Sequence, residues 1–162
     1  MRIGILSDSH GRTDTTARAV ALLRERGAEL LLHLGDIGDE HVIDELIGHN
    51  ARLVFGNCDW DIADLTRHAQ FMGVVVDHPM GLIEAGGRRI AFTHGHLPEL
   101  MRQALDLEVD YLLHGHSNEL RDERLGRTRI INPGALQRAA RYTAAVLDPA
   151  ADALEIIEVA KS

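Results

Sequence analysis

The first third of the chain alternates short apolar runs with amphipathic segments. The apolar runs predict strands, and the segments whose apolar residues recur every three or four positions predict helices. In chain order, the predicted elements are a strand at 2–7, a helix at 14–26, a strand at 30–34, a helix at about 39–48 and a strand at 52–56. This order of strand, helix and strand predicts parallel strands joined by right-handed crossovers.

The second half of the chain has a different rhythm, because its apolar runs follow one another closely. Gly86-Gly87 and Gly126-Arg127 are turn signals that predict two hairpins. The predicted elements are strands at 72–77, 81–85 and 88–93, a helix at about 97–107, a strand at 110–114, a hairpin of 120–125 and 128–132, and a final antiparallel pair at 142–148 and 153–159. The two halves together predict an α/β fold of two stacked mixed sheets with helices outside, as one domain over 1–162.

Composition narrows the class of protein. A net charge of −8 over 162 residues argues against a protein that tracks a nucleic-acid polymer, which needs clustered Lys and Arg. No apolar run reaches the roughly 18 residues of a membrane span, and the start of the chain lacks a signal-peptide pattern. The single cysteine, Cys58, cannot form an internal disulfide, which indicates a reducing compartment. We therefore expect a cytoplasmic protein that binds neither membranes nor polymeric nucleic acid.

Five of the predicted strands end in residues that can bind a metal ion. The segments at these ends read SDSH, GD, GNCD, THGH and HGHS, and they contain Asp8, His10, Asp36, Asn57, His94, His96, His114 and His116. Because ligands of open α/β sheets bind outside the carboxyl ends of the strands, we expect these side chains to converge. Carboxylates, imidazoles and an amide suit Mn, Fe, Zn, Ni or Co, whereas a thiolate site needs more than one cysteine. Motifs of a serine nucleophile elbow, a P-loop and a dinucleotide-binding fold are absent.

This series of motifs, D-x-H, GD, GN-x-D, G-H and H-G-H, resembles that of the calcineurin-like metallophosphoesterases. The GNCD form at 56–59 and the small size are most similar to the YfcE/MJ0936-type phosphodiesterases, whose fold the retromer subunit Vps29 shares. The resemblance covers the whole chain and includes an N-P-G turn at 132–134. It implies a four-layer αββα sandwich with a site for two metal ions.

The resemblance also implies which residues bind the two divalent ions, with Mn as the first choice and Fe, Zn, Ni or Co as the others. Asp36 would bridge both ions, and the remaining ligands would be Asp8, His10 and His116 on the first ion and Asn57, His94 and His114 on the second. In two-metal chemistry, a hydroxide that bridges the ions attacks phosphorus in line. The implied activity is hydrolysis of a small phosphodiester, and small members of the family often form dimers.

Two positions depart from the wider family. Cys58 stands where larger relatives carry a histidine that is assigned to leaving-group protonation, and a thiol with a pKa of about 8.5 is a poor substitute. We therefore expect His96 to be the general acid, with Asp36 as the other catalytic residue. The segment SNEL after His116 replaces the commoner T-H-x-P, a change that could reshape the substrate pocket.

Several alternatives stay open at this point. A phosphomonoesterase or a nucleotide pyrophosphohydrolase would use the same ligands, and a Vps29-like protein-binding scaffold would keep the fold without turnover. His33 lies within an apolar run, which favours a core histidine or one that orients a ligand over a direct metal ligand. Asp59 is expected either to hold a ligand in place or to cap the helix that follows it.

Overall fold

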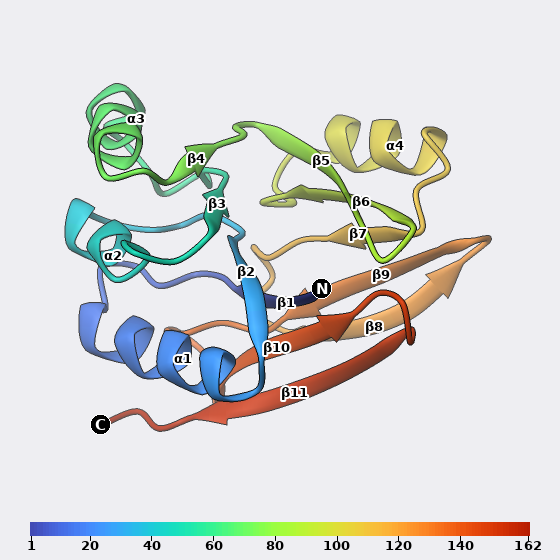
Figure 1. The fold of residues 1–162 in the computed structure, drawn as a ribbon. Helices are drawn as coiled ribbons and strands as arrows, with labels where there is room; N and C mark the ends of the chain where they lie inside the picture. The colour runs from blue at the N-terminus through green and yellow to red at the C-terminus, as the bar shows by residue number, and fades with distance from the viewer.

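The computed structural model describes all residues from Met1 to Ser162 and consists of two β-sheets with helices on their outer faces (Figure 1). In the larger sheet, β1 to β4 run parallel, while β10 pairs antiparallel with both β1 and β11. Across this sheet the strands are β11 (Ala153–Val159), β10 (Tyr142–Asp148), β1 (Arg2–Leu6), β2 (Ala28–His33), β3 (Ala51–Leu53) and β4 (Val75–Val76).

The smaller sheet is built from two hairpins and one central strand. Its order is β5 (Met80–Ala85), β6 (Arg88–Thr93), β7 (Tyr111–Leu113), β9 (Thr128–Pro133) and β8 (Leu120–Leu125). The strands β6, β7 and β9 run parallel, and the hairpins β5–β6 and β8–β9 form at the two predicted turns. The predicted final pair is confirmed as β10 and β11.

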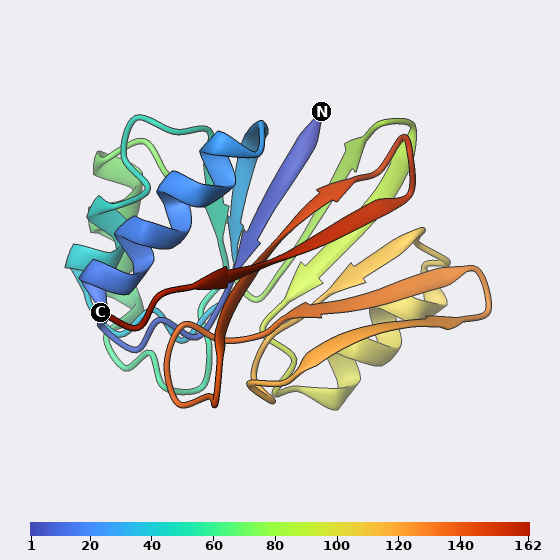
Figure 2. The ribbon, with the colours of Figure 1, turned by 90° about the horizontal axis from the view of Figure 1, so that it is seen from below.

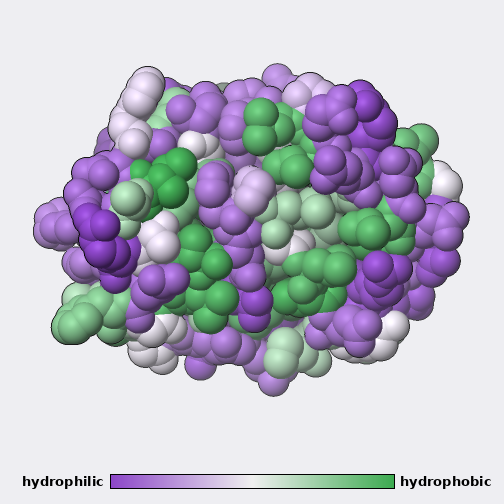
Figure 3. Space-filling model, turned by 90° about the horizontal axis from the view of Figure 1, so that it is seen from above, coloured by the Kyte–Doolittle hydropathy of each residue, from purple (hydrophilic) through white to green (hydrophobic).

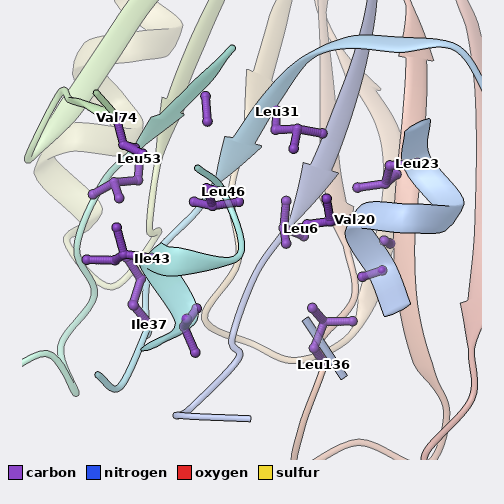
Figure 4. Close-up of a cluster of buried hydrophobic side chains, with 14 of the residues drawn as sticks. Leu6, Val20, Leu23, Leu31, Ile37, Ile43, Leu46, Leu53, Val74 and Leu136 are labelled. Atoms are coloured by element: carbon purple, nitrogen blue, oxygen red, sulfur yellow. The ribbon is translucent and has the colours of Figure 1, made fainter. Parts of the chain in front are cut away.

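Three hydrophobic layers hold these elements together. One layer packs α1 (Thr13–Glu25), α2 (Glu40–Asp44) and α3 (Ile62–Phe71) on the larger sheet, the second lies between the sheets, and the third packs α4 (Pro98–Asp106) on the smaller sheet. Figure 4 shows part of the first layer, with Val20 and Leu23 of α1 and Ile43 of α2 beside the larger sheet. The alternation of side chains along β2 explains how one strand contributes to two layers: Leu31 faces the helices, while Leu30 and Leu32 face the other sheet. The four-layer αββα sandwich is therefore confirmed.

The region between β3 and β5 differs from the sequence prediction. The predicted strand at 72–77 is wrong for its first half, because α3 extends to Phe71, Met72 caps it and Gly73 turns the chain with a φ of 80°. Only Val75 and Val76 pair with β3. Helix α3 escaped prediction because only Leu65 and Ala69 are buried along it, too few for a clear apolar period. The predicted helix at 39–48 is regular only over Glu40–Asp44 and continues as turns.

The carboxyl ends of the parallel strands of both sheets lie on the same side of the molecule. In Figure 2 the arrows of β1, β2, β6 and β7 point toward the same group of loops. The residues that follow these four strands and β3 include all of those that sequence analysis selected as metal ligands. None of the helices is long and apolar enough to span a membrane.

Candidate metal centre

The loops after β1 and β2 lie against each other and hold their side chains in an unusual backbone conformation. Backbone N–H groups of Asp8 and His10 donate to the carbonyl oxygens of Gly35 and Asp36 at 3.0 and 2.9 Å. Asp8, His10 and Asp36 have φ values of 57°, 44° and 53°, and His116 has 73°. Non-glycine residues adopt positive φ only where the surrounding structure enforces it, and such strain concentrates at functional sites.

Asp36 lies at the centre of the cluster. Its Oδ1 accepts the backbone N–H of Cys58 at 2.8 Å, while its Oδ2 lies 3.3 Å from His94 Nε2 and 3.6 Å from His10 Nε2. Burial opposes ionisation of Asp36, but the hydrogen bonds from His94 and Cys58 outweigh it and hold its pKa well below the usual range. Asp36 is therefore an ionised carboxylate that is shared between His10 and His94.

Asn57, His94 and His116 converge on one point. Asn57 Oδ1 lies 3.1 Å from both His94 Nε2 and His116 Nδ1. The other ring nitrogen of His94, Nδ1, lies 2.7 Å from the carbonyl oxygen of Leu34, which accepts an N–H. The Leu34 carbonyl thus fixes the ring orientation, as a carbonyl does for a metal-binding histidine, and directs Nε2 at Asn57 Oδ1 and Asp36 Oδ2. Nε2 carries a hydrogen toward these oxygens, and a bound metal ion would take the place of that hydrogen.

Asp8 supplies a buried carboxylate oxygen that has no hydrogen-bond partner. Its Oδ2 accepts the Ser7 hydroxyl at 2.6 Å and the His116 backbone N–H at 3.2 Å, but Oδ1 is unpaired. Burial is the main cause of a raised pKa for Asp8. An unpaired buried acceptor is costly, and a metal ion at this place would satisfy it. His10 Nε2 lies 3.9 Å from this free oxygen.

Two groups of side chains bring ligand atoms within 4.8 Å of one another, and Asp36 belongs to both. One group contains Asp8, Asp36 and His94, and the other contains His10, Asp36 and Cys58. Oxygen and nitrogen donors of this kind suit a divalent transition metal. Asp36 is therefore the residue common to both groups. The groups do not divide as the resemblance does, because Asp8 and His94, which it assigns to different ions, lie together and because the second group includes the Cys58 thiol.

His114 is buried at the same strand ends but has different neighbours. Its Nδ1 lies 2.9 Å from the Gly115 carbonyl oxygen, and its Nε2 lies 3.2 Å from Arg121 Nη1. Neither ring nitrogen has Asn57 or Asp36 as a hydrogen-bond partner. Burial lowers the pKa of His114, so the imidazole is neutral near pH 7 and retains a lone pair. Nothing in the sequence indicated the contact with Arg121.

Two glycines allow this close packing. A Cβ atom at Gly56 would lie 2.1 Å from Asp36 Oδ1, and one at Gly115 would lie 2.0 Å from Ser7 Oγ. Neither position can accept a side chain without displacing the carboxylate or the hydroxyl group beside it. The glycines of the GD, GN-x-D and H-G-H motifs are therefore part of the site's construction.

His96 and Cys58 lie at the edge of this cluster and are half-buried. The ring centroid of His96 lies 5.4 Å from that of His94 and 6.1 Å from that of His116, and its Nδ1 has no partner. Burial and the neighbouring Asp36 raise the pKa of the Cys58 thiol, so the thiol stays protonated near neutral pH. The His96 ring thus lies beside the candidate ligands with its Nδ1 buried and unpaired, whereas the Cys58 thiol is protonated.

Asp59 and His33 support the loops rather than belong to the ligand set. The buried Asp59 carboxylate accepts the backbone N–H groups of Gly38 and Gly56 at 2.9 and 2.8 Å. It therefore fixes the metal-binding loops, and Asp61 occupies the cap position of α3 instead. His33 is fully buried, with Nε2 2.8 Å from Ser9 Oγ and Nδ1 accepting the Gly35 N–H at 3.2 Å.

Comparison with known families agrees with this geometry. The model of the calcineurin-like phosphoesterase superfamily domain matches residues 1–152. The chain belongs to this superfamily. It is 27% identical over 139 residues to phosphodiesterase MJ0936 of Methanocaldococcus jannaschii, and the match covers 83% of each protein. It is 31% identical over 144 residues to the probable metallophosphoesterase YsnB of Bacillus subtilis, and that match covers 85% of this chain and 76% of YsnB.

Solved structures share the fold. An archaeal phosphodiesterase superposes with a TM-score of 0.88 at 24% identity, over 98% of this chain and 99% of that one. Vps29 of Entamoeba histolytica, in a complex with zinc, superposes with a TM-score of 0.67 at 17% identity, over 98% of this chain and 99% of that one. The same sandwich is therefore found both in a phosphodiesterase and in a Vps29 protein, so the function has to be argued from the site.

Proposed function

We propose that this protein is a metal-dependent phosphodiesterase that hydrolyses a small phosphodiester. The observation that carries the proposal is the position of Asp36, whose Oδ2 lies 3.3 Å from His94 Nε2 and 3.6 Å from His10 Nε2, two histidines assigned to different ions. Relatives named as phosphodiesterases, MJ0936 and YfcE of Escherichia coli, support the same activity. In this proposal Asp36 bridges two divalent ions.

The remaining ligands divide between the two ions. The first set is Asp8, His10 and His116, and the second set is Asn57, His94 and His114. Mn²⁺ is the first choice for this mixture of oxygen and nitrogen donors, with Fe, Zn, Ni or Co as alternatives. When bound, the two ions would supply an activated water as the nucleophile and positive charge for the phosphoryl oxygens.

The chain's own residues then have distinct tasks. The ionised Asp36 and the buried Asp8 provide negative charge that holds the cations in place. Asp59 fixes the loops through Gly38 and Gly56, so the ligands are positioned before substrate arrives. His96, whose ring lies beside those of His94 and His116, is the proposed proton donor to the leaving group.

The proposed partners follow from charge and surface. A net charge of −8 favours a small phosphodiester over a polymeric nucleic acid, and the lone Cys58 agrees with a cytoplasmic location. Hydrophobic side chains lie among polar ones on the face over α3, β4, β5 and α4 (Figure 3), and Phe71 at the end of α3 is 87% exposed. A homodimer is therefore part of the proposal, and a monomeric mass by light scattering would contradict it.

Two other functions are compatible with the fold. A phosphomonoesterase or nucleotide pyrophosphohydrolase of the same superfamily would use the same ligands on a different leaving group. A Vps29-like scaffold would need no turnover, and the fold similarity to Vps29 favours it as an alternative. The intact set of seven ligand side chains argues for the enzyme.

The deciding experiment compares bis-p-nitrophenyl phosphate with p-nitrophenyl phosphate, using metal-stripped protein with and without added Mn²⁺. We expect diester hydrolysis that requires the metal and exceeds monoester hydrolysis. A preference for the monoester would indicate the phosphatase alternative. Absence of turnover with metal bound would indicate the scaffold.

Metal content provides a second test that is independent of turnover. His116→Ala removes a nitrogen that lies 3.1 Å from Asn57 Oδ1, and we expect less than the full two equivalents of Mn²⁺ per chain. His41→Ala is the matched control, since His41 is an exposed histidine of α2. Unchanged metal content in the His116 variant would show that the ligand assignment is wrong.

A further inference from the structure

A pocket of about 440 Å³ lies directly beside the proposed metal centre. One wall is formed by residues 117–120, which follow His116, and the other by residues 138–141, which follow the N-P-G turn. Gly134 and Thr143 complete the lining. No residue of the lining belongs to the proposed ligand set, so the pocket is a neighbouring space with chemistry of its own.

Arg138 is the free cation of this pocket. Its guanidinium forms no ion pair or hydrogen bond within the chain, whereas Arg141, the other arginine of the lining, is paired with Glu158 at 2.8 Å. The segment of Arg138 is anchored beside the metal centre, because the N–H of Leu136, two residues earlier, donates to the carbonyl oxygen of Ser7, the neighbour of Asp8, at 3.1 Å. An unpaired arginine between a pocket and a metal centre is suited to bind an anion there.

The backbone on both walls is held in a strained conformation. Asn118 and Arg138 have φ values of 62° and 58°, and His116, which leads into the first wall, has 73°. Such residues persist where the surrounding structure fixes them, and they are concentrated at ligand-binding sites. Each wall is therefore a bend that contains a non-glycine residue in the left-handed conformation.

The lining also offers hydrogen-bond acceptors. The Glu119 carboxylate is exposed on the first wall and forms no ion pair within the chain. Leu120, Ala139 and Ala140 provide apolar contact. Acceptors beside an apolar surface suit a ring-bearing group with hydroxyl donors, and the volume is within the usual range of small-molecule sites.

We propose that this pocket binds one organic group of the phosphodiester, a hydroxyl-bearing group such as a nucleoside, and that Arg138 binds the phosphate at its rim. The inference rests on the proposed phosphodiesterase function and names the substrate class for it. It assigns a role to the segment after His116, which departs from the commoner family sequence. Arg138 is here a substrate-binding residue, and the ions and their ligands do the chemistry.

The first test uses two diesters with the same leaving group and the Mn²⁺-loaded protein. Thymidine 5′-(p-nitrophenyl phosphate) carries a nucleoside, whereas methyl p-nitrophenyl phosphate carries none. We expect kcat/KM to favour the nucleoside ester by about tenfold or more. Ala140→Trp, which fills the pocket from an exposed position, should lower kcat/KM for the nucleoside ester far more than for the methyl ester and so abolish this preference. Ala139→Trp is a second variant of the same kind.

The second test concerns Arg138. Arg138→Ala should raise KM for both esters about tenfold and change kcat far less, because a hydrogen bond to a charged group is lost from binding. Arg138→Lys should recover part of the affinity. Arg102→Ala is the control, since Arg102 is exposed on α4 and paired with Glu99. An unchanged KM in Arg138→Ala would overturn the role of Arg138.

A binding measurement separates this inference from the proposed function. Calorimetric titration of the Mn²⁺-loaded protein with thymidine 5′-monophosphate and with inorganic phosphate requires no turnover. Tighter binding of the nucleotide, lost in Ala140→Trp, would support the pocket even if no diester were hydrolysed. Equal affinity for the two, or a preference that survives in Ala140→Trp, would overturn it.

Discussion

Asp36 Oδ2 lies 3.3 Å from His94 Nε2, and this contact joins the loop after β2 of the larger sheet to the end of β6 in the smaller sheet. The same oxygen is 3.6 Å from His10 Nε2. The candidate metal centre therefore depends on the stacking of the two sheets, since neither sheet alone contains all of its ligands. The apolar layer between the sheets, to which Ile5 and Phe92 belong, thus fixes the geometry of the site.

The charge of Asp36 can be removed with little change in shape. We expect Asp36→Asn to lose metal and to lower diester turnover by more than about a hundredfold, because loss even of groups that only orient metal ligands costs 10–100-fold. Elemental analysis and the rate on bis-p-nitrophenyl phosphate measure both effects. Asp106→Asn, at an exposed position of α4, is the control. Full metal occupancy in Asp36→Asn would contradict a bridging role.

Two kinds of element could be predicted from the sequence: strands that are buried on both faces, and hairpins whose turn contains glycine. Strands β1 and β2 are continuous apolar runs because helices cover one face and a sheet covers the other. The hairpin at Gly86-Gly87 was predictable for a different reason, since its turn requires positive φ at both positions. Helix α3 was not, because it buries only two of its residues, and the predicted strand at 72–77 is correct only over Val75 and Val76.

The candidate site was partly predictable for a related reason. Each proposed ligand lies next to the end of a strand, so its position along the sequence indicated its position in space. The contact of Arg121 with His114 and the place of Arg138 beside the metal centre carry no such signal. Arg121 belongs to the largely exposed strand β8, and Arg138 follows a turn. Neither residue comes directly after a buried parallel strand, so only the folded structure shows that they lie near the site.

Cys58 contributes its backbone rather than its thiol. Its N–H donates to Asp36 Oδ1, and burial raises the pKa of the thiol. Cys58→Ser keeps the N–H and a small side chain, so we expect kcat on bis-p-nitrophenyl phosphate to stay within about threefold of wild type, far from the loss of a catalytic acid or base. A fall of a hundredfold would give the thiol a catalytic role.

His96 should matter only when the leaving group needs a proton. His96→Asn removes the unpaired ring nitrogen near His94 and His116. We expect a loss of about a hundredfold or more on a diester with a phenol leaving group and little change with p-nitrophenol, because a general acid assists poor leaving groups most. His41→Asn controls for loss of an exposed imidazole. Equal losses on both esters would indicate a structural or metal-binding role instead.

His33 should make the folded state sensitive to acid. Burial, the largest cause, and the charge of His94 and His10 lower its pKa to about 3, although Asp36 acts in the opposite direction. In the unfolded chain a histidine titrates near about 6.5, so below that pH the unfolded state binds a proton that folded His33 does not. Stability therefore falls as pH drops from about 6.5 toward 3, and His33 alone contributes a loss of about 2 kcal/mol between pH 7 and 5. Urea unfolding of metal-free protein at both values measures it. We expect the loss of unfolding free energy between pH 7 and 5 to be smaller by that amount in His33→Asn and to be unchanged in His41→Asn. An equal pH dependence in wild type and His33→Asn would show that His33 does not cause the acid sensitivity.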